Sequence, residues 1–114
     1  MTPQTAYKVL TDAEMKALET GVFAGAPVDL QDGYIHLSTA DQLTETVDRH
    51  FAGRSDLWVA AVDLTAQDDP VRWESSRGGA LFPHLYGPLL LETVIAYEPL
   101  MRDEDGTVRL PVAG

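Results

Sequence analysis

The chain has 114 residues, of which 45% are apolar and 23% charged, and its 18 acidic against eight basic side chains leave a formal charge of −10. Such a surface repels nucleic-acid backbones, and the lack of cysteine excludes disulfides, thiolate nucleophiles and cysteine-ligated zinc. No stretch has the pattern of a signal peptide or a membrane span, so we expect one cytoplasmic domain over residues 1–114, without nucleic-acid or membrane partners.

The first elements are well signalled. Ala6 to Leu10 is typical of a short strand, and Thr11-Asp12-Ala13-Glu14 matches a capping box that opens a helix. This helix carries Met15 and Leu18 inward and ends before Gly21. The following stretch, from Gly25 to Gly33, contains glycine, proline and aspartate and is predicted to be an irregular loop.

A second strand and helix follow. Tyr34 to Leu37 is predicted to be a strand, and Thr39 to Gln42 forms another capping box. Behind this box, Leu43, Val47 and Phe51 recur every four residues, which predicts a helix that ends near Gly53.

The second half favours strands. Leu57 to Leu64 is the most strand-like run and is expected to be central, while the alternation from Val71 to Glu74 suits a half-exposed strand. Ser75 to Leu90 is expected to be a long, partly apolar connection. After it come a strand from Thr93 to Tyr97 and a hairpin turned by Asp105-Gly106. We therefore predict an α+β domain with two N-terminal helices packed on a mostly antiparallel sheet.

Strand alternation makes the segment around His36 a candidate binding site. It places Tyr34, His36 and Ser38 on one face, and Ile35 and Leu37 on the core face. Ser38 and Thr39 precede a helix, whose free N–H groups and dipole favour an anion such as a sugar phosphate. In the alternative interpretation, Ser38 or Thr39 only caps the helix and His36 bonds to backbone.

His84 and Glu74 are further candidates. Pro83 and Pro88 restrict the segment around His84, and such segments often place side chains for binding, although His84 also fits a surface position on a self-packed loop. Glu74 lies beside Trp73, where partial burial would raise the pKa of its carboxyl and suit acid–base chemistry, but a solvated strand end is equally compatible.

Other site types have weaker signals. His36, His84 and Glu74 would supply the ligands of a catalytic zinc site, but no metal-ligand spacing occurs and we expect no metal. His50 is interpreted as a helix-face residue. Arg72 and Arg77, with Arg49 and Arg54 as a second pair, are the only basic groupings, enough for a small phosphorylated ligand.

Two segments also carry a family resemblance. They are Gly33 to Thr39 with Gln42, and Leu81 to Leu89, joined by Phe51-Ala52-Gly53. These motifs resemble a bacterial and plant family of unknown function, number 952, over about Tyr7 to Leu100. Members of that family look like distant relatives of the ADP-ribosyltransferase fold, a split and curved β-sheet that binds NAD.

The resemblance implies a function. It implies that NAD is a substrate, that His36 contacts the ribose hydroxyls, and that Tyr34 or Tyr86 stacks on the nicotinamide ring. In the same hypothesis Glu74 would stabilise the ribosyl cation or steer an acceptor, and His84 would be a second catalytic histidine. The diphosphate would meet Ser38 and the helix start at Thr39, together with Arg72 or Arg77. Glu74 precedes Tyr86, whereas the catalytic glutamate of many such transferases follows its tyrosine. A non-catalytic module that binds a nucleotide, a sugar phosphate or a partner protein is therefore the alternative.

Overall fold

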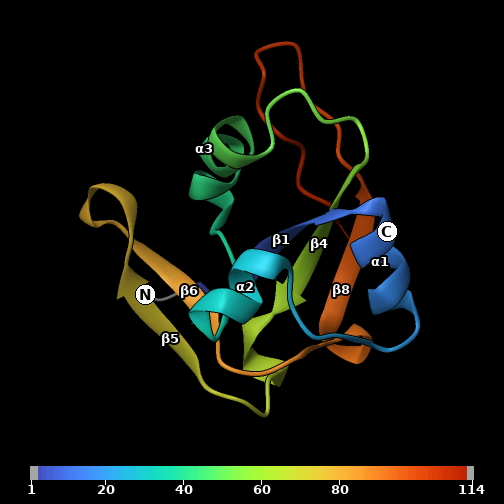
Figure 1. Cartoon of the computed structure of the whole chain (residues 1–114). Helices are drawn as coiled ribbons and strands as arrows, with labels where there is room; N and C mark the ends of the chain where they lie inside the picture. Colours follow the sequence, from blue (N-terminus) through green and yellow to red (C-terminus); the bar gives the residue numbers. More distant parts are fainter. Residues whose placement is uncertain (1–2, 113–114) are drawn as a thin grey trace.

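Three α-helices alternate with the first four of eight β-strands, and the last four strands follow, along residues 3–112, the part of the chain that the computed structural model describes (Figure 1). The helices are α1 (Asp12–Glu19), α2 (Pro27–Asp32) and α3 (Ala40–His50). The strands are β1 (Thr5–Thr11), β2 (Val22–Phe23), β3 (Ile35–His36), β4 (Leu57–Asp63), β5 (Val71–Ser75), β6 (Leu81–Leu85), β7 (Leu89–Leu90) and β8 (Val94–Pro99). The predicted α+β class is confirmed.

The strands form antiparallel sheets that divide beside β1. Two three-stranded sheets have the orders β1-β4-β8 and β3-β6-β5, and β2 pairs with β7 in a small third sheet. A single bridge joins the two larger sheets: the N–H of Tyr7 donates to the carbonyl of Ser38 at 2.7 Å, and the N–H of Ser38 donates back at 2.9 Å. Beyond Ser38 the chain turns into α3, so the two sheets separate there (Figure 1).

Apolar side chains cover both faces of the β1-β4-β8 sheet. One cluster joins Leu10 and Val62 to Met15 and Leu18 of α1, and extends to Ile35 and Leu37. The other packs Val9 and Val59 against Leu43 and Val47 of α3, with Val108. Because the sheet is buried on both sides, the strand β4 reads as a continuous apolar run, and its predicted central position is confirmed.

Both predicted helices begin at the predicted caps. In α1, the hydroxyl of Thr11 accepts from the N–H of Glu14 at 3.3 Å, and the Glu14 carboxylate accepts from the N–H of Thr11 at 2.9 Å. In α3, the side-chain oxygen of Gln42 accepts from the N–H of Thr39 at 3.0 Å. The apolar spacing therefore placed the buried faces of both helices correctly.

The predicted loop from Gly25 to Gly33 is wrong, because it contains the helix α2. Pro27 occupies the first turn, and Gly33 ends the helix with a left-handed φ of 87°. A six-residue helix is too short to show an apolar period. Residues 3–112 therefore contain three α-helices rather than the two that we predicted.

The predicted long connection from Ser75 to Leu90 is also wrong, because it contains β6 and β7. Pro83 argued against a strand, yet it lies within the central strand β6. The Pro83 carbonyl accepts a hydrogen bond from the N–H of Leu37 at 3.1 Å. The Pro83 nitrogen faces the same neighbour, the segment just beyond β3, which ends at His36. Pro83 therefore forms only one of the two bonds of an antiparallel pair with Leu37, at the point where β3 ends and the sheet divides.

The last predicted hairpin is reduced to one bridge between Arg102 and Val108, closed by a turn at Gly106 with a φ of 89°. No helix within residues 3–112 is long and apolar enough to cross a bilayer.

Candidate functional site

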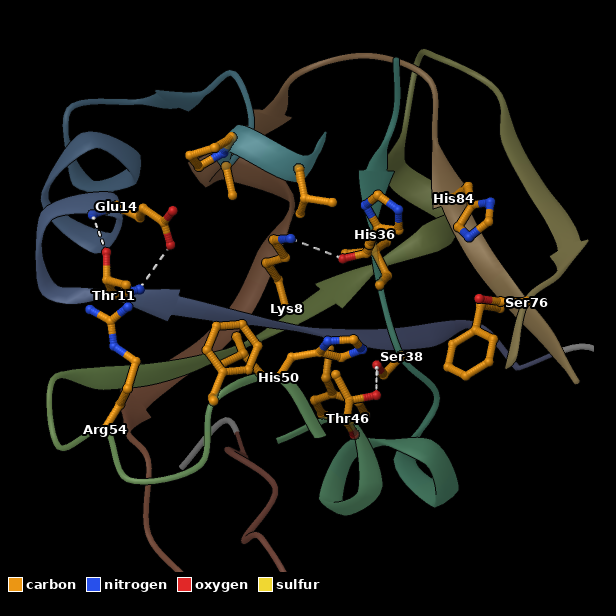
Figure 2. A pocket seen from close by; sticks show the side chains of 18 residues that line it. Lys8, Thr11, Glu14, His36, Ser38, Thr46, His50, Arg54, Ser76 and His84 are labelled. Carbon is orange, nitrogen blue, oxygen red and sulfur yellow. Dashed lines mark hydrogen bonds between the residues drawn. The ribbon is translucent and has the colours of Figure 1, made fainter. Parts of the chain in front are cut away.

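A cavity of about 540 Å³ occupies the space where the two larger sheets separate. Its lining comes from β1, α2, the β3–α3 segment, α3 and β6, and includes His36, Ser38 and His84. Figure 2 shows His36 and His84 at one end, Glu14 and Arg54 at the other, and Lys8 and His50 between them. Its volume lies in the range of small-molecule sites.

The cavity is unusually basic for an acidic chain. Among residues 3–112, all three histidines line it, with two of the eight lysines and arginines but only one of the 18 acids, Glu14. Lys8 and Arg54 are each paired with a carboxylate, from Asp29 and Asp56 respectively. The lining therefore presents mainly hydrogen-bond donors, and the acids that pair with them are not among the lining residues, which suits a ligand with anionic and polar groups.

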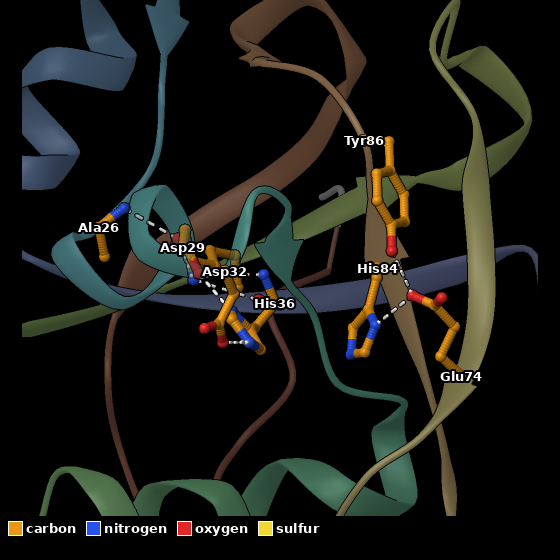
Figure 3. A network of polar contacts seen from close by, with 8 residues as sticks. Ala26, Asp29, Asp32, His36, Glu74, His84 and Tyr86 are labelled. Atoms are coloured by element: carbon orange, nitrogen blue, oxygen red, sulfur yellow. Dashed lines mark hydrogen bonds and ion pairs between the residues drawn. The ribbon is translucent and has the colours of Figure 1, made fainter.

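His36 is held by two aspartates of α2 (Figure 3). Its Nδ1 lies 2.6 Å from Oδ1 of Asp29, and its Nε2 lies 3.0 Å from Oδ2 of Asp32. The His36 backbone N–H also donates to Asp29 at 3.1 Å. The strand and the helix thus orient the imidazole from both sides.

Asp29 is the buried centre of this arrangement, with a side chain that is 1% exposed. Lys8, itself buried in β1, lies 2.9 Å from Oδ2 of Asp29 and donates to the His36 carbonyl at 3.1 Å. Burial by itself would raise the pKa of Asp29, but the His36 hydrogen bond, the charge of Lys8 and the Ala26 N–H outweigh it and lower this pKa to about 2. Asp29 is therefore ionised at neutral pH.

His84 lies opposite His36 in the β3–β6 register but has different neighbours. Its Nδ1 lies 2.8 Å from Oε1 of Glu74, which also accepts from the Tyr86 hydroxyl at 2.7 Å (Figure 3). Tyr34 stacks on the His84 ring with centroids 4.1 Å apart and an interplanar angle of 21°. The hydrogen bonds from His84 and Tyr86 lower the pKa of Glu74.

This finding bears on the expected chemistry of Glu74. We expected that burial beside Trp73 would raise the pKa of its carboxyl, and the direction is the opposite. Glu74 is also absent from the cavity lining. It reaches the cavity only through His84, and the hydrogen bond that it accepts from the Tyr86 hydroxyl raises the pKa of Tyr86. In this structure Glu74 orients His84 and does not face a ligand in the cavity.

Ser38 and Thr39 have separate roles. The Ser38 hydroxyl lies 2.9 Å from the Thr46 hydroxyl, and both side chains line the cavity. Thr39 precedes α3 as its cap and is absent from the lining. Thus Ser38 does not cap the helix, and the hydroxyl pair faces the space beneath His36 (Figure 2).

The other predicted contacts lie outside this cavity. Tyr34 lines a second hollow of about 420 Å³ with Gly87 and Pro88. The Arg72 guanidinium lies over the Tyr86 ring, 4.8 Å from its centroid. The backbone of Arg77 begins a short 3₁₀ turn, whereas its side chain lies outside the described part of the structure. In the described ranges, no three His, Cys, Asp or Glu side chains form a group that could hold a metal ion.

Sequence reasoning missed Lys8, Asp29 and Asp32 and assigned His50 to a helix face. A signal for Lys8 was available, because alternation puts it between Ala6 and Leu10 on the core side of β1. A lysine there needs a buried partner. No comparable signal marks His50, since only the packing of α3 along the cavity brings it to the site.

Comparison with known proteins identifies the family of the chain. Residues 9–97 match the family described as protein of unknown function (DUF952). The chain belongs to this family. The match includes both histidine segments and the α2 aspartates, whereas Lys8 lies one residue before it.

The fold is similar to that of solved structures. The crystal structure of protein CC0527 from Caulobacter crescentus is 44% identical, covers 93% of this chain and 94% of its own, and has a TM-score of 0.82. A double mutant of that protein gives 43% identity and the same TM-score, and its solution NMR structure gives 44% and 0.77. Among curated proteins, none matches the chain.

Proposed function

We propose that this DUF952 protein handles NAD or an ADP-ribose-type nucleotide as a transferase or hydrolase, in a cleft centred on His36. The observation that carries the proposal is the convergence of His36, Ser38 and His84 on one cavity where the sheet divides. The resemblance to the ADP-ribosyltransferase fold agrees with this division, because a split sheet is the feature that fold uses to bind NAD.

The proposed reaction breaks the bond between the ribose C1′ and the nicotinamide nitrogen. The bonding electron pair leaves with nicotinamide, and an acceptor oxygen from water or a hydroxyl forms the new bond to C1′ and loses its proton. The residues need only position the ribose and stabilise the positive charge that develops on it. His36 holds the ribose hydroxyls, and His84, oriented by Glu74, faces the same cavity as an acceptor for that proton.

The test uses His36→Ala and Glu74→Ala, with Gln31→Ala as an exposed control on α2. NAD is incubated with each protein, and released nicotinamide is quantified by chromatography. We expect loss of turnover in the first two variants, unchanged turnover in the control, and cooperative unfolding in all three. A wild-type protein that releases no nicotinamide at any enzyme concentration would contradict catalysis of NAD cleavage.

The position of Glu74 favours a second candidate, a non-catalytic nucleotide-binding module. The carboxylate expected to stabilise a ribosyl cation is engaged by His84 and Tyr86 outside the lining. A binding module would show no turnover but would melt at a higher temperature with ADP-ribose, and His36→Ala would abolish that increase. If ADP-ribose shifts the melting temperature of neither protein, both candidates fail.

A further inference from the structure

His36 differs from an ordinary neutral histidine because both ring nitrogens face carboxylates. Nδ1 is 2.6 Å from Asp29 and Nε2 is 3.0 Å from Asp32. An ionised carboxylate only accepts hydrogen bonds, so each of these nitrogens must carry a proton to make its contact. The geometry therefore fits a doubly protonated imidazolium, with one acidic group on each side (Figure 3).

The two acidic groups differ in burial and in their number of partners. The side chain of Asp29 is 1% exposed and receives hydrogen bonds from Ala26, His36 and Lys8. Asp32 is the last residue of α2, its side chain is 38% exposed, and its contact in this arrangement is the Nε2 of His36. Asp29 is thus buried in the interior, whereas the exposed Asp32 is not among the residues that line the cavity but holds Nε2 of His36, so a ligand that reaches this nitrogen must share or displace it.

The charges decide what such a ligand can be. With both ring nitrogens of His36 donating, Lys8 and His36 carry the positive charges that balance the negative charges of Asp29 and Asp32. A phosphate at Nε2 would meet the Asp32 carboxylate at close range and gain no net attraction. A hydroxyl can accept from Nε2 and donate to Asp32 at the same time.

We propose that Asp32 is a specificity-determining residue that makes the His36 end of the cavity a subsite for sugar hydroxyls and excludes phosphate from it. The inference rests on the proposed function, which it deepens by orienting the ligand. The phosphates then lie toward His50 and Arg54 at the other end (Figure 2). Arg54 uses two of its nitrogens on Asp56 and keeps further N–H donors for an anion.

Asp32→Asn tests this assignment, because it removes one negative charge and keeps the size of the side chain. Inorganic phosphate and D-ribose are titrated separately into isotope-labelled protein, while the His36 ring signals are followed by NMR. Phosphate affinity at His36 is expected to rise roughly five- to tenfold and ribose affinity to fall, since one uncompensated positive charge is worth about 1 kcal/mol at a partly exposed site. Asp32→Glu is expected to restore the wild-type order.

Asp68→Asn is the matched control, because it makes the same change in net charge at an exposed residue of the β4–β5 connection. It should leave both affinities unchanged. Equal gains in phosphate affinity from Asp68→Asn and Asp32→Asn would overturn the proposal, as would an unchanged phosphate-to-ribose ratio in Asp32→Asn. Wild-type His36 signals that respond to phosphate but not to ribose would overturn it too.

These outcomes are independent of NAD turnover. A protein that shows the expected selectivity but cleaves no NAD retains the Asp32 assignment and loses the catalytic proposal. A protein that cleaves NAD while Asp32→Asn leaves the selectivity unchanged retains catalysis and loses the Asp32 assignment.

Discussion

His36 and His84 lie directly opposite each other in the β3–β6 register, yet their surroundings differ in burial and charge. His36 has a side chain that is 33% exposed, with a carboxylate at each ring nitrogen and a buried ion pair behind it. The His84 side chain is only 4% exposed, with one carboxylate at Nδ1 and a tyrosine ring stacked on it.

The difference indicates separate roles for the two imidazoles. Carboxylates lie at both ring nitrogens of His36, so both nitrogens act as hydrogen-bond donors. The Glu74 carboxylate at Nδ1 orients the His84 ring. No contact of this kind calls for a proton on Nε2, so Nε2 can accept a hydrogen bond. His36 as donor and His84 as acceptor form a complementary pair on neighbouring strands. Substitutions on the His36 side and then on the His84 side test this pairing.

The largest effect is expected on the His36 side from Asp29→Ala. This change leaves Lys8 buried without its carboxylate, and removal of one partner from a buried ion pair costs about 3–5 kcal/mol. Urea unfolding followed by circular dichroism measures the loss of unfolding free energy. Asp32→Asn is the control and is expected to stay within about 0.5 kcal/mol of wild type.

A double variant tests whether the unpaired charge of Lys8 causes the loss of stability. Lys8→Met combined with Asp29→Ala should recover part of the lost stability, because it removes the unpaired charge. If the double variant is less stable than the single one by the full cost of a second core change, the ion pair is not the source of the effect.

Acid is expected to weaken the same region by roughly 2 kcal/mol. The pKa of Asp29 is lowered in the folded protein to about 2, from an ordinary value of 3.8. The unfolded chain therefore binds the proton first, and the stabilisation, which is complete above about pH 4, is lost as the pH falls from about 4 to about 2. Unfolding free energies measured across this range should decline more steeply for wild type than for Asp29→Asn.

The smallest effect is expected on the His84 side from Tyr34→Ala. Loss of the stacked ring should cost about 1 kcal/mol, the usual worth of an aromatic pair, and should shift the His84 ring signals in NMR spectra. Tyr34→Phe keeps the ring and should preserve both the stability and those signals. Equal losses in the two variants would point to the Tyr34 hydroxyl, and not to the stack.

Local patterns predicted the parts of the fold that depend on neighbours in the chain. Thr11 with Glu14 marked the start of α1, and the alternation from Tyr34 to Leu37 placed Ile35 in the core and His36 on the opposite face. The helix α2 could have been found from Pro27 at its start and Gly33 at its end. The strand β6 could not, since Pro83 is tolerated only because β3 ends beside it.

The sequence by itself determined the α+β class, the two capped helices and the outward face that carries His36, because each follows from contacts a few residues apart. Only the tertiary structure decided that His84 sits across from His36, that Glu74 serves His84 outside the cavity, and that Lys8 meets Asp29. These contacts join residues 10 to 48 positions apart in the chain. They depend on how the strands pair where the sheet divides, which no local pattern specifies.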